Sequence, residues 1–245
     1  MPSLTSHTAT LCYDECGQSF PLLTFAPAGL QSPLAVWSRP SASVNPTTAF
    51  ATDVRGIAME QRNAGGQSRA PLTAQDGWPT DAADHLTLLA HLGIAQGHLD
   101  GQGIGGSFSF SMRMAQPQRS ASAVIAPTSG RVGPMPSSRS ATVAAWAQAL
   151  QDHPEATEQV LEAFTQHLYG PGFVSSGDRA CVARCQTPCL VLASNDAAHP
   201  CASSEEVAQG LPHAEVIPEC QAGAPLALAQ VRMQQFLMAH TPVRA

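Results

Sequence analysis

Residues 97–108 read GHLDGQGIGGSF, and this stretch decides the fold. It begins with a brief predicted strand over residues 97–100 and continues into a glycine-rich turn over 101–106. A predicted helix follows over 107–115. A strand that enters a helix through several glycines indicates a sharp turn, in which backbone segments approach more closely than side chains allow.

The turn has two interpretations. Gly101, Gly103 and Gly106 fit the pattern G-x-G-x-x-G, which places the pyrophosphate of a dinucleotide on a helix N-terminus. Gly101 and Gly105 instead fit G-x-nucleophile-x-G, the strained turn that presents a catalytic side chain. Because both turns need glycine for the same steric reason, the motif alone does not separate them.

The sequence around the turn disfavours a nucleotide cofactor. The dinucleotide motif requires an acidic residue roughly 20 positions later, to bind the ribose. No Asp or Glu occurs between Gly101 and Gln151. Arg131 could bind a ribose phosphate instead, but it falls in a predicted loop. We therefore expect no cofactor.

Short apolar runs alternate with helical patterns along the chain, which predicts an α/β fold with a mostly parallel sheet flanked by helices. The expected strands are residues 22–26, 54–59, 97–100, 121–126, 189–193 and 215–217, and the expected helices are 81–92, 107–115, 203–209 and 224–239. Residues 131–186 interrupt this alternation with two further helical stretches, 141–150 and 155–168. We expect one domain over 1–245 that carries a helical lid insertion at 131–186.

The composition limits the partners. The net charge is −6, only 12% of residues are charged, and all twelve basic residues are Arg. A broad cationic surface for nucleic acid is therefore not expected. No apolar run reaches the ~18 residues that span a membrane, and no secretory signal is recognisable at the N-terminus. The expected partner is a small molecule, and a homo-oligomer is possible.

The chain contains seven cysteines, an odd number, which favours thiols and a reducing, cytoplasmic location. Cys181, Cys185 and Cys189 recur every four residues. A structural zinc site usually needs closer pairs with two further ligands nearby. Cys189 also lies within an apolar predicted strand, where a thiol packs as a small hydrophobic group. We therefore expect no metal site.

Several ordered segments resemble the α/β-hydrolase superfamily. The loop 59–68 (MEQRNAGGQS) is similar to the acidic-x-Arg-x-x-Gly-x-Ser loop that follows that superfamily's fourth strand. The segment 26–29 (APAG) occupies the place of its oxyanion loop, and 131–186 the place of its lid. Members that spell the turn Gly-x-Cys-x-Gly-Gly carry a thiol where this chain has Gly103. The resemblance implies the fold more strongly than the chemistry.

Two of the three catalytic positions that the resemblance implies lack the usual residue. The nucleophile position is Gly103, which has no side chain that can attack a carbonyl. The loop 218–223, which should carry the catalytic histidine, contains none. Asp196 remains at the position of the triad acid. The expected protein is therefore inactive or weak as an ordinary hydrolase, with an incomplete Ser/Cys-His-Asp triad.

Other residues keep alternatives open. His199, near Asp196, could act as a displaced base, and Cys220 stands where the superfamily has its histidine. With Asp196 these two residues would support an active esterase or acyl hydrolase.

The backbone N–H of Ile104 and one from Ala28 or Gly29 could still form an anion hole beside Gln102 and Gly103. The sequence thus predicts a pocket for a small ester-like or acyl-like molecule at this turn. Ser107, one helical turn beyond Gly103, is expected to bond its own helix backbone.

Overall fold

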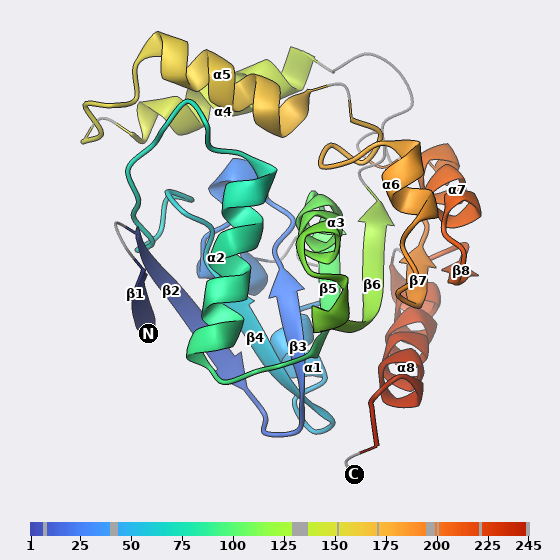
Figure 1. The fold of residues 1–245 in the computed structure, drawn as a ribbon. Helices are drawn as coiled ribbons and strands as arrows, with labels where there is room; N and C mark the ends of the chain where they lie inside the picture. The colour runs from blue at the N-terminus through green and yellow to red at the C-terminus, as the bar shows by residue number, and fades with distance from the viewer. Residues whose placement is uncertain are drawn as a thin grey trace.

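A computed structural model of the chain describes residues 1–245 except 7–8, 40–43, 129–136, 151, 171, 195–198, 200, 221 and 244–245. Eight strands form one sheet in the order β1-β2-β4-β3-β5-β6-β7-β8 (Figure 1). The strands are β1 (Ser3–Ser6), β2 (Ala9–Cys16), β3 (Phe20–Phe25), β4 (Val54–Met59), β5 (Gly97–Gly103), β6 (Ser120–Thr128), β7 (Cys189–Leu192) and β8 (Ala214–Ile217). β2 is antiparallel to β1 and β4, and all later neighbours are parallel.

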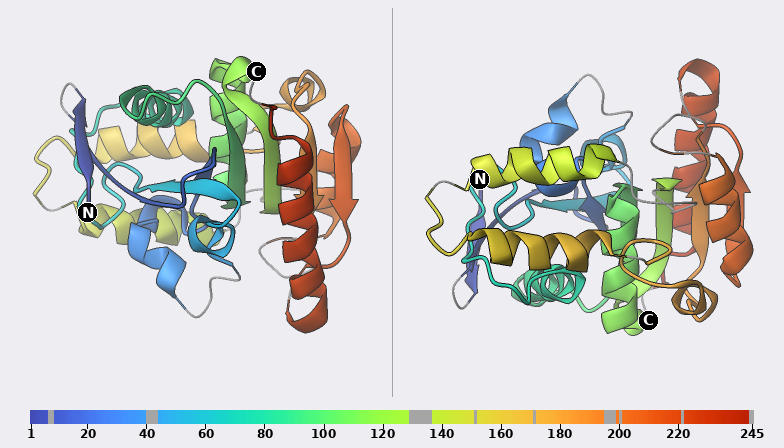
Figure 2. Two further views of the ribbon diagram at one scale, coloured as in Figure 1. Left: turned by 90° about the horizontal axis from the view of Figure 1, so that it is seen from below. Right: turned by 90° about the horizontal axis from the view of Figure 1, so that it is seen from above.

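Helices cover both faces of the sheet (Figure 2). α2 (Trp78–His91) packs against α3 (Gly105–Ala115), and α7 (Cys201–Gly210) contributes to the same core. The opposite face carries α1 (Pro46–Ala49) and α8 (Gly223–Ala239). Three short 3-10 turns complete this framework: η1 (Gly29–Gln31), η2 (Leu34–Ser38) and η3 (Pro117–Arg119). The predicted α/β architecture is confirmed.

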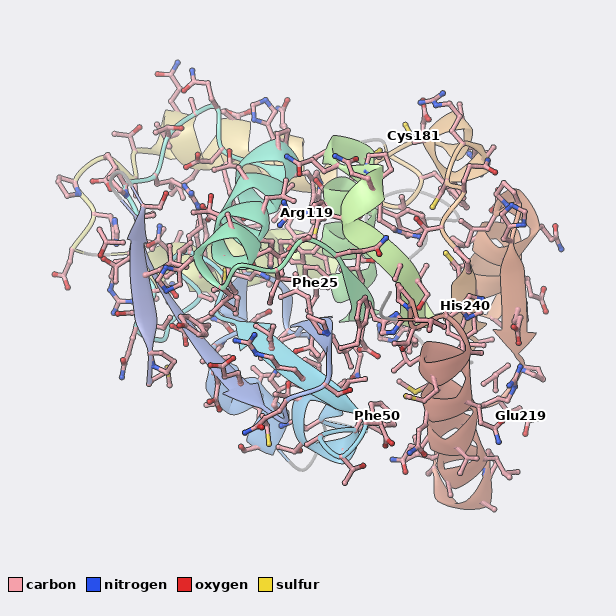
Figure 3. All side chains as sticks on the ribbon, turned by 60° about the horizontal axis from the view of Figure 1, so that its bottom comes forward. Phe25, Phe50, Arg119, Cys181, Glu219 and His240 are labelled. Atoms are coloured by element: carbon pink, nitrogen blue, oxygen red, sulfur yellow. The ribbon has the colours of Figure 1, made fainter. Side chains whose placement is uncertain are left out.

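Alternating side chains build the two cores, because successive residues of a strand point to opposite faces. In β6, Ile125 belongs to the cluster under α2 and α3, whereas its neighbour Val124 belongs to the cluster under α8. Leu22 and Leu23 in β3 divide in the same way. Figure 3 labels one member of each cluster, Phe25 and Phe50. Burial on both faces explains why the central strands read as continuous apolar runs.

The observed elements differ from the expected ones mainly at the N-terminus. β4 has the predicted bounds, and β5 runs three residues beyond the predicted end, through the glycines. The hairpin β1–β2 and the short helix α1 were not predicted. β2 ends in exposed polar residues, including Asp14 and Glu15, so no apolar run marks it.

The segment expected to form a lid contains α4 (Ser137–Gln148), α5 (Glu158–Tyr169) and α6 (Arg179–Ala183). α4 and α5 lie side by side across the carboxyl ends of the strands (Figures 1 and 2). Two indole N–H groups attach them to the core: Trp146 Nε1 donates to Asn63 O at 2.7 Å, and Trp78 Nε1 donates to Leu168 O at 3.1 Å. The bounds 131–186 stay a prediction.

Asp100 is an unusual component of the central strand β5. Its side chain is fully buried, and burial raises the pKa of Asp100 to about 7. The nearby Gln102 amide opposes this rise, although no described group makes a well-aligned hydrogen bond with either carboxyl oxygen. Asp100 therefore retains its proton to near-neutral pH in the folded chain, and deprotonation there costs stability.

Replacing Asp100 by Asn should remove this pH-dependent cost. The folded pKa of about 7 exceeds the unfolded value of 3.8, so the cost grows as pH rises from about 4 to about 7. We expect the stability of Asp100→Asn relative to wild type to increase by about 2–3 kcal/mol between pH 5 and pH 8. Urea unfolding of both proteins at the two pH values measures this difference. An unchanged difference would show that Asp100 is ionised in the folded state.

Candidate functional site

The turn between β5 and α3 requires glycine at two positions. A Cβ atom on Gly101 would lie 2.5 Å from Gly105 O, and one on Gly105 would lie 2.3 Å from Phe25 O. Both distances are shorter than real Cβ contacts, so strand and helix pack directly backbone to backbone. At Gly106 the nearest contact would be a side-chain methyl, Ile125 Cγ2 at 3.2 Å. The two strictly required glycines are those of the G-x-nucleophile-x-G interpretation.

Gly103 lies at the bend itself, with φ +54° in the left-handed region. A Cβ built on it would lie 3.4 Å from both Cβ and O of Pro27 and 3.5 Å from His199 Nε2. These are ordinary van der Waals distances, so a small side chain fits at residue 103. Left-handed backbone is a tolerable strain for a single non-glycine residue.

His199 approaches this turn from the loop between β7 and α7. The resemblance instead implies a histidine in the next such loop, between β8 and α8. The loop after β8 contains no histidine, yet an imidazole nitrogen still faces residue 103. This position agrees with the open alternative that His199 acts as a displaced base, and its catalytic role stays a prediction. Asp196 lies outside the described residues.

Cys220 packs in the core. It is 7% exposed and belongs to the cluster under α8, together with Leu190 and Phe236. Its thiol donates a hydrogen bond to Ala193 O at 3.0 Å. A thiol that already donates to a backbone carbonyl in an apolar cluster is poorly placed to act as a nucleophile.

The side chain of Gln102 is also committed to the fold. It is buried, and its amide donates to Val44 O at 3.2 Å. This bond ties β5 to the segment before α1. We therefore assign to Gln102 a structural contact, rather than the ligand-binding role that the sequence suggested.

The two chain turns that are expected to form the anion hole lie close together, and the anion hole itself stays a prediction. Ile104 is the N-cap of α3, and Gly29 opens the turn η1 with φ +62°. The first N–H groups of a helix have no acceptor within the helix. Ala28 caps η1, and its carbonyl accepts from Gln31 N at 3.1 Å.

Tyr169, at the end of α5, is a site residue that the sequence analysis missed. Its hydroxyl lies 3.6 Å from the position of a Cβ on Gly29, and Ile104 Cγ2 lies 3.9 Å from the same point. The insertion thus contributes a buried phenol to the neighbourhood of Gly29 and Ile104. An aromatic residue at the end of a predicted helix 155–168 gave no signal of this position.

Glu60 organises the loop after β4. One carboxylate oxygen accepts from Gln67 N at 2.5 Å and Ser68 N at 2.6 Å, and the other accepts from Leu34 N at 3.2 Å. A Cβ on Gly66 would lie 1.7 Å from Glu60 Oε1, so glycine is required there. The acidic-x-Arg-x-x-Gly-x-Ser pattern therefore describes a structural loop around a buried carboxylate.

Arg62 of the same loop forms an ion pair beneath the site. It donates twice to Asp84 of α2, at 2.8 Å each, and lies 3.6 Å from Asp76. Burial raises the pKa of nearby Asp81, and burial lowers the pKa of His85 to about 4. Neutral His85 donates from Nδ1 to Asp81 O at 2.6 Å and accepts from Gln61 at 3.2 Å. These groups brace α2 against the loop after β4.

A cavity of about 20 Å³ lies between this loop and the insertion. Its walls include Gly29, Arg62, Phe108, Trp146 and Phe164. The volume holds about one water molecule, so a larger ligand on this side of Gly29 requires α4 and α5 to move. Among the described residues, no three His, Cys, Asp or Glu side chains gather as a metal site.

Comparison with solved structures identifies the fold. Est816, described as an N-acyl homoserine lactone degrading enzyme, is 18% identical with a TM-score of 0.68, over 98% of this chain and 100% of that one. The enol-lactonase from Burkholderia xenovorans LB400 is 19% identical with a TM-score of 0.67, over 98% and 99% of the two chains. A hydrolase from Pseudomonas aeruginosa PA01 is 23% identical with a TM-score of 0.64, over 96% and 97%.

The chain has the α/β-hydrolase fold, and the resemblance seen in the sequence is confirmed at this level. No protein-family model matches the sequence. A comparison with curated proteins likewise found no significant match.

Alanine substitution at Gly105 and at Gly103 should distinguish a position that requires glycine from one that tolerates a small side chain. Gly105→Ala forces a Cβ against Phe25 O, so we expect a loss of about 3 kcal/mol or more. Gly103→Ala meets ordinary contacts and should cost only about 1–2 kcal/mol for its left-handed backbone. Urea denaturation of the two variants and wild type tests this order, and a reversed order would contradict the structure of the turn.

Proposed function

We propose that this protein binds a small ester-like, lactone-like or acyl-like molecule at the β5–α3 turn and is inactive or weak as an ordinary hydrolase. The observation that carries the proposal is glycine at residue 103, at the left-handed bend where an attacking side chain would stand. Pro27 and the imidazole of His199 face a position that has no nucleophilic atom of its own.

The loss of the nucleophile has a large kinetic consequence. Removing the nucleophile or the base from a catalytic triad costs about 10⁶ in rate, whereas an anion hole and binding alone retain about 10³–10⁴ over water. His199 Nε2 could still orient a water molecule in the space that residue 103 leaves open. Such a reaction would proceed by direct water attack, without a covalent intermediate.

The chemical class of the ligand follows from the donors. Backbone N–H groups at helix starts stabilise oxygen that bears negative charge, as in a polarised carbonyl or a carboxylate. Two structural neighbours, Est816, described as a lactone-degrading enzyme, and an enol-lactonase, agree with this class. Lactones and short esters are therefore the first ligands to test.

An active hydrolase with displaced residues is the second candidate. The position of His199 favours it, since an imidazole within reach of the turn is half of a catalytic pair. The buried Cys220, whose thiol donates to Ala193 O, does not add a nucleophile to this candidate. A nucleotide site at Gly101, Gly103 and Gly106 has weaker support, because Gly106 is not strictly required.

Other expectations stay predictions. They are a small-molecule ligand, no nucleic-acid partner, a possible homo-oligomer, no cofactor and a cytoplasmic location. Within the described part of the chain, no helix combines the length and the apolar character needed to cross a bilayer.

Restoring a side-chain hydroxyl should create a catalytic pair. In Gly103→Ser the new Cβ lies 3.5 Å from His199 Nε2, which brings Oγ within hydrogen-bond reach of the imidazole. We expect kcat/KM for p-nitrophenyl acetate or butyrate to rise at least about 100-fold above wild type. The assay compares purified proteins at pH 7.5 with Gly103→Ala as the matched control, because alanine adds the Cβ without the hydroxyl.

A second substitution tests the role of the imidazole. Adding His199→Ala to Gly103→Ser should return kcat/KM to near the wild-type level, since serine without a base is a poor nucleophile. Substantial wild-type turnover that disappears in His199→Ala alone would reject the proposal in favour of the second candidate.

A further inference from the structure

A second cavity lies at the opposite edge of the sheet from residue 103. It has a volume of about 540 Å³ and is lined by Ser120, the first residue of β6, and by Thr187 and Pro188, which precede β7. Because β5, β6 and β7 are parallel, their starting ends share one edge, whereas Gly103 ends β5 at the other. The cavity is therefore separate from the candidate acyl site.

A buried arginine joins two cysteines beside this cavity. Arg113, near the end of α3, is 3% exposed. Its Nη1 donates to Cys185 Sγ at 3.1 Å and to Cys189 Sγ at 2.9 Å, while Nε donates to Ser109 O at 3.3 Å. Within the described ranges, no carboxylate pairs with this guanidinium. Two sulfur atoms thus take the place that an acidic partner usually occupies.

Charge balance assigns different protonation states to the two sulfurs. A buried cation is costly without a nearby anion. The hydrogen bond from the Cys189 thiol, followed by attraction to Arg113, lowers the pKa of Cys185 to about 5. The same hydrogen bond and burial raise the pKa of Cys189. These effects favour a thiolate at Cys185 and a protonated thiol at Cys189, whose Sγ also donates to Thr187 O at 3.2 Å.

The thiolate is accessible from the cavity. Cys185 is partly exposed and forms part of the cavity wall with Phe110, Met114 and Pro117. Arg113 also lines the cavity, and its Nη2 has no hydrogen-bond partner among the described residues. An oxygen that enters along the apolar wall would therefore meet a nucleophilic sulfur next to a buried guanidinium.

We propose that Cys185 and Cys189 form a peroxide-reactive dithiol, in which Cys185 attacks a small hydroperoxide and Cys189 completes a disulfide. Both sulfurs bond to one nitrogen atom, so they lie within about 6 Å of each other, and rotation of the side chains can bring them together. Cys181, on α6 (Figure 3), lines the same cavity. Among the described residues, the Arg113 guanidinium donates hydrogen bonds to the sulfurs of Cys185 and Cys189 but not to that of Cys181.

The reaction balances in two steps. The Cys185 thiolate attacks one peroxide oxygen, the O–O bond breaks, and the leaving hydroxide or alkoxide takes a proton from solvent. Sulfur is oxidised to sulfenic acid and the peroxide is reduced to water or an alcohol. The Cys189 sulfur then attacks the sulfenic sulfur, forming an S–S bond and releasing water.

Mass spectrometry of the full-length protein tests the pairing. After brief treatment with stoichiometric hydrogen peroxide, we expect wild type to lose about 2 Da and to yield a disulfide between Cys185 and Cys189 on peptide mapping. Cys189→Ala should stop at sulfenic acid on Cys185, captured by dimedone, and Cys185→Ala should abolish the disulfide. Cys181→Ala is the matched control and should react like wild type.

Alkylation of unmodified wild type provides a second, independent readout. Peptides from a limited iodoacetamide reaction at pH 6.5 should show Cys185 modified about tenfold faster than exposed Cys16, because only the thiolate reacts. Equal rates at the two residues would overturn the proposal. So would a peroxide-induced disulfide that persists in Cys185→Ala or that joins other cysteines.

Discussion

The rest of the structure depends on the direct backbone contact where β5 enters α3. Gly101 and Gly105 allow this contact, since a Cβ on either residue would overlap a carbonyl oxygen 2.5 or 2.3 Å away. The contact forces the chain to reverse within a few residues, and the reversal leaves residue 103 at a left-handed bend with Pro27 and His199 facing it. Glycine therefore stands at the bend where the proposal places the missing nucleophile.

The two candidate sites show how one sheet separates two chemistries. At the carboxyl ends of the strands, Gly29, Ile104 and Tyr169 lie close together beside the proposed carbonyl-binding position. At the starting ends, the Arg113 guanidinium contacts the sulfur atoms of Cys185 and Cys189. Between them lies Asp100, whose buried carboxyl remains protonated to near-neutral pH. The same rule sets the protonation state of each buried group: a buried charge persists only where a partner or a hydrogen bond stabilises it.

The sequence predicted the strands that continuous apolar runs mark, but not the contacts between segments far apart in the chain. Apolar runs such as 54–59 and 189–193 located central strands closely, because burial on both faces leaves a continuous signal. The hairpin β1–β2 was missed because its polar end carries no such run. That His199 lies close to Gly103 was only one of several possibilities in the sequence. The distance between the β7–α7 loop and the β5–α3 turn depends on how the sheet is assembled. Ser107 was expected to bond its own helix but donates to Val174 O, a contact 67 residues away that no local pattern contains.

The central claim is that the turn binds carbonyl compounds without forming an acyl-enzyme. The most direct measurement is rapid acid quench of the wild-type protein with p-nitrophenyl acetate, followed by peptide mapping of acyl groups. We expect no acyl group on Ser107, on Cys220 or on any residue of the β5–α3 turn. An acyl group at one of these positions, formed and lost at the rate of turnover, would show that the turn forms an acyl-enzyme.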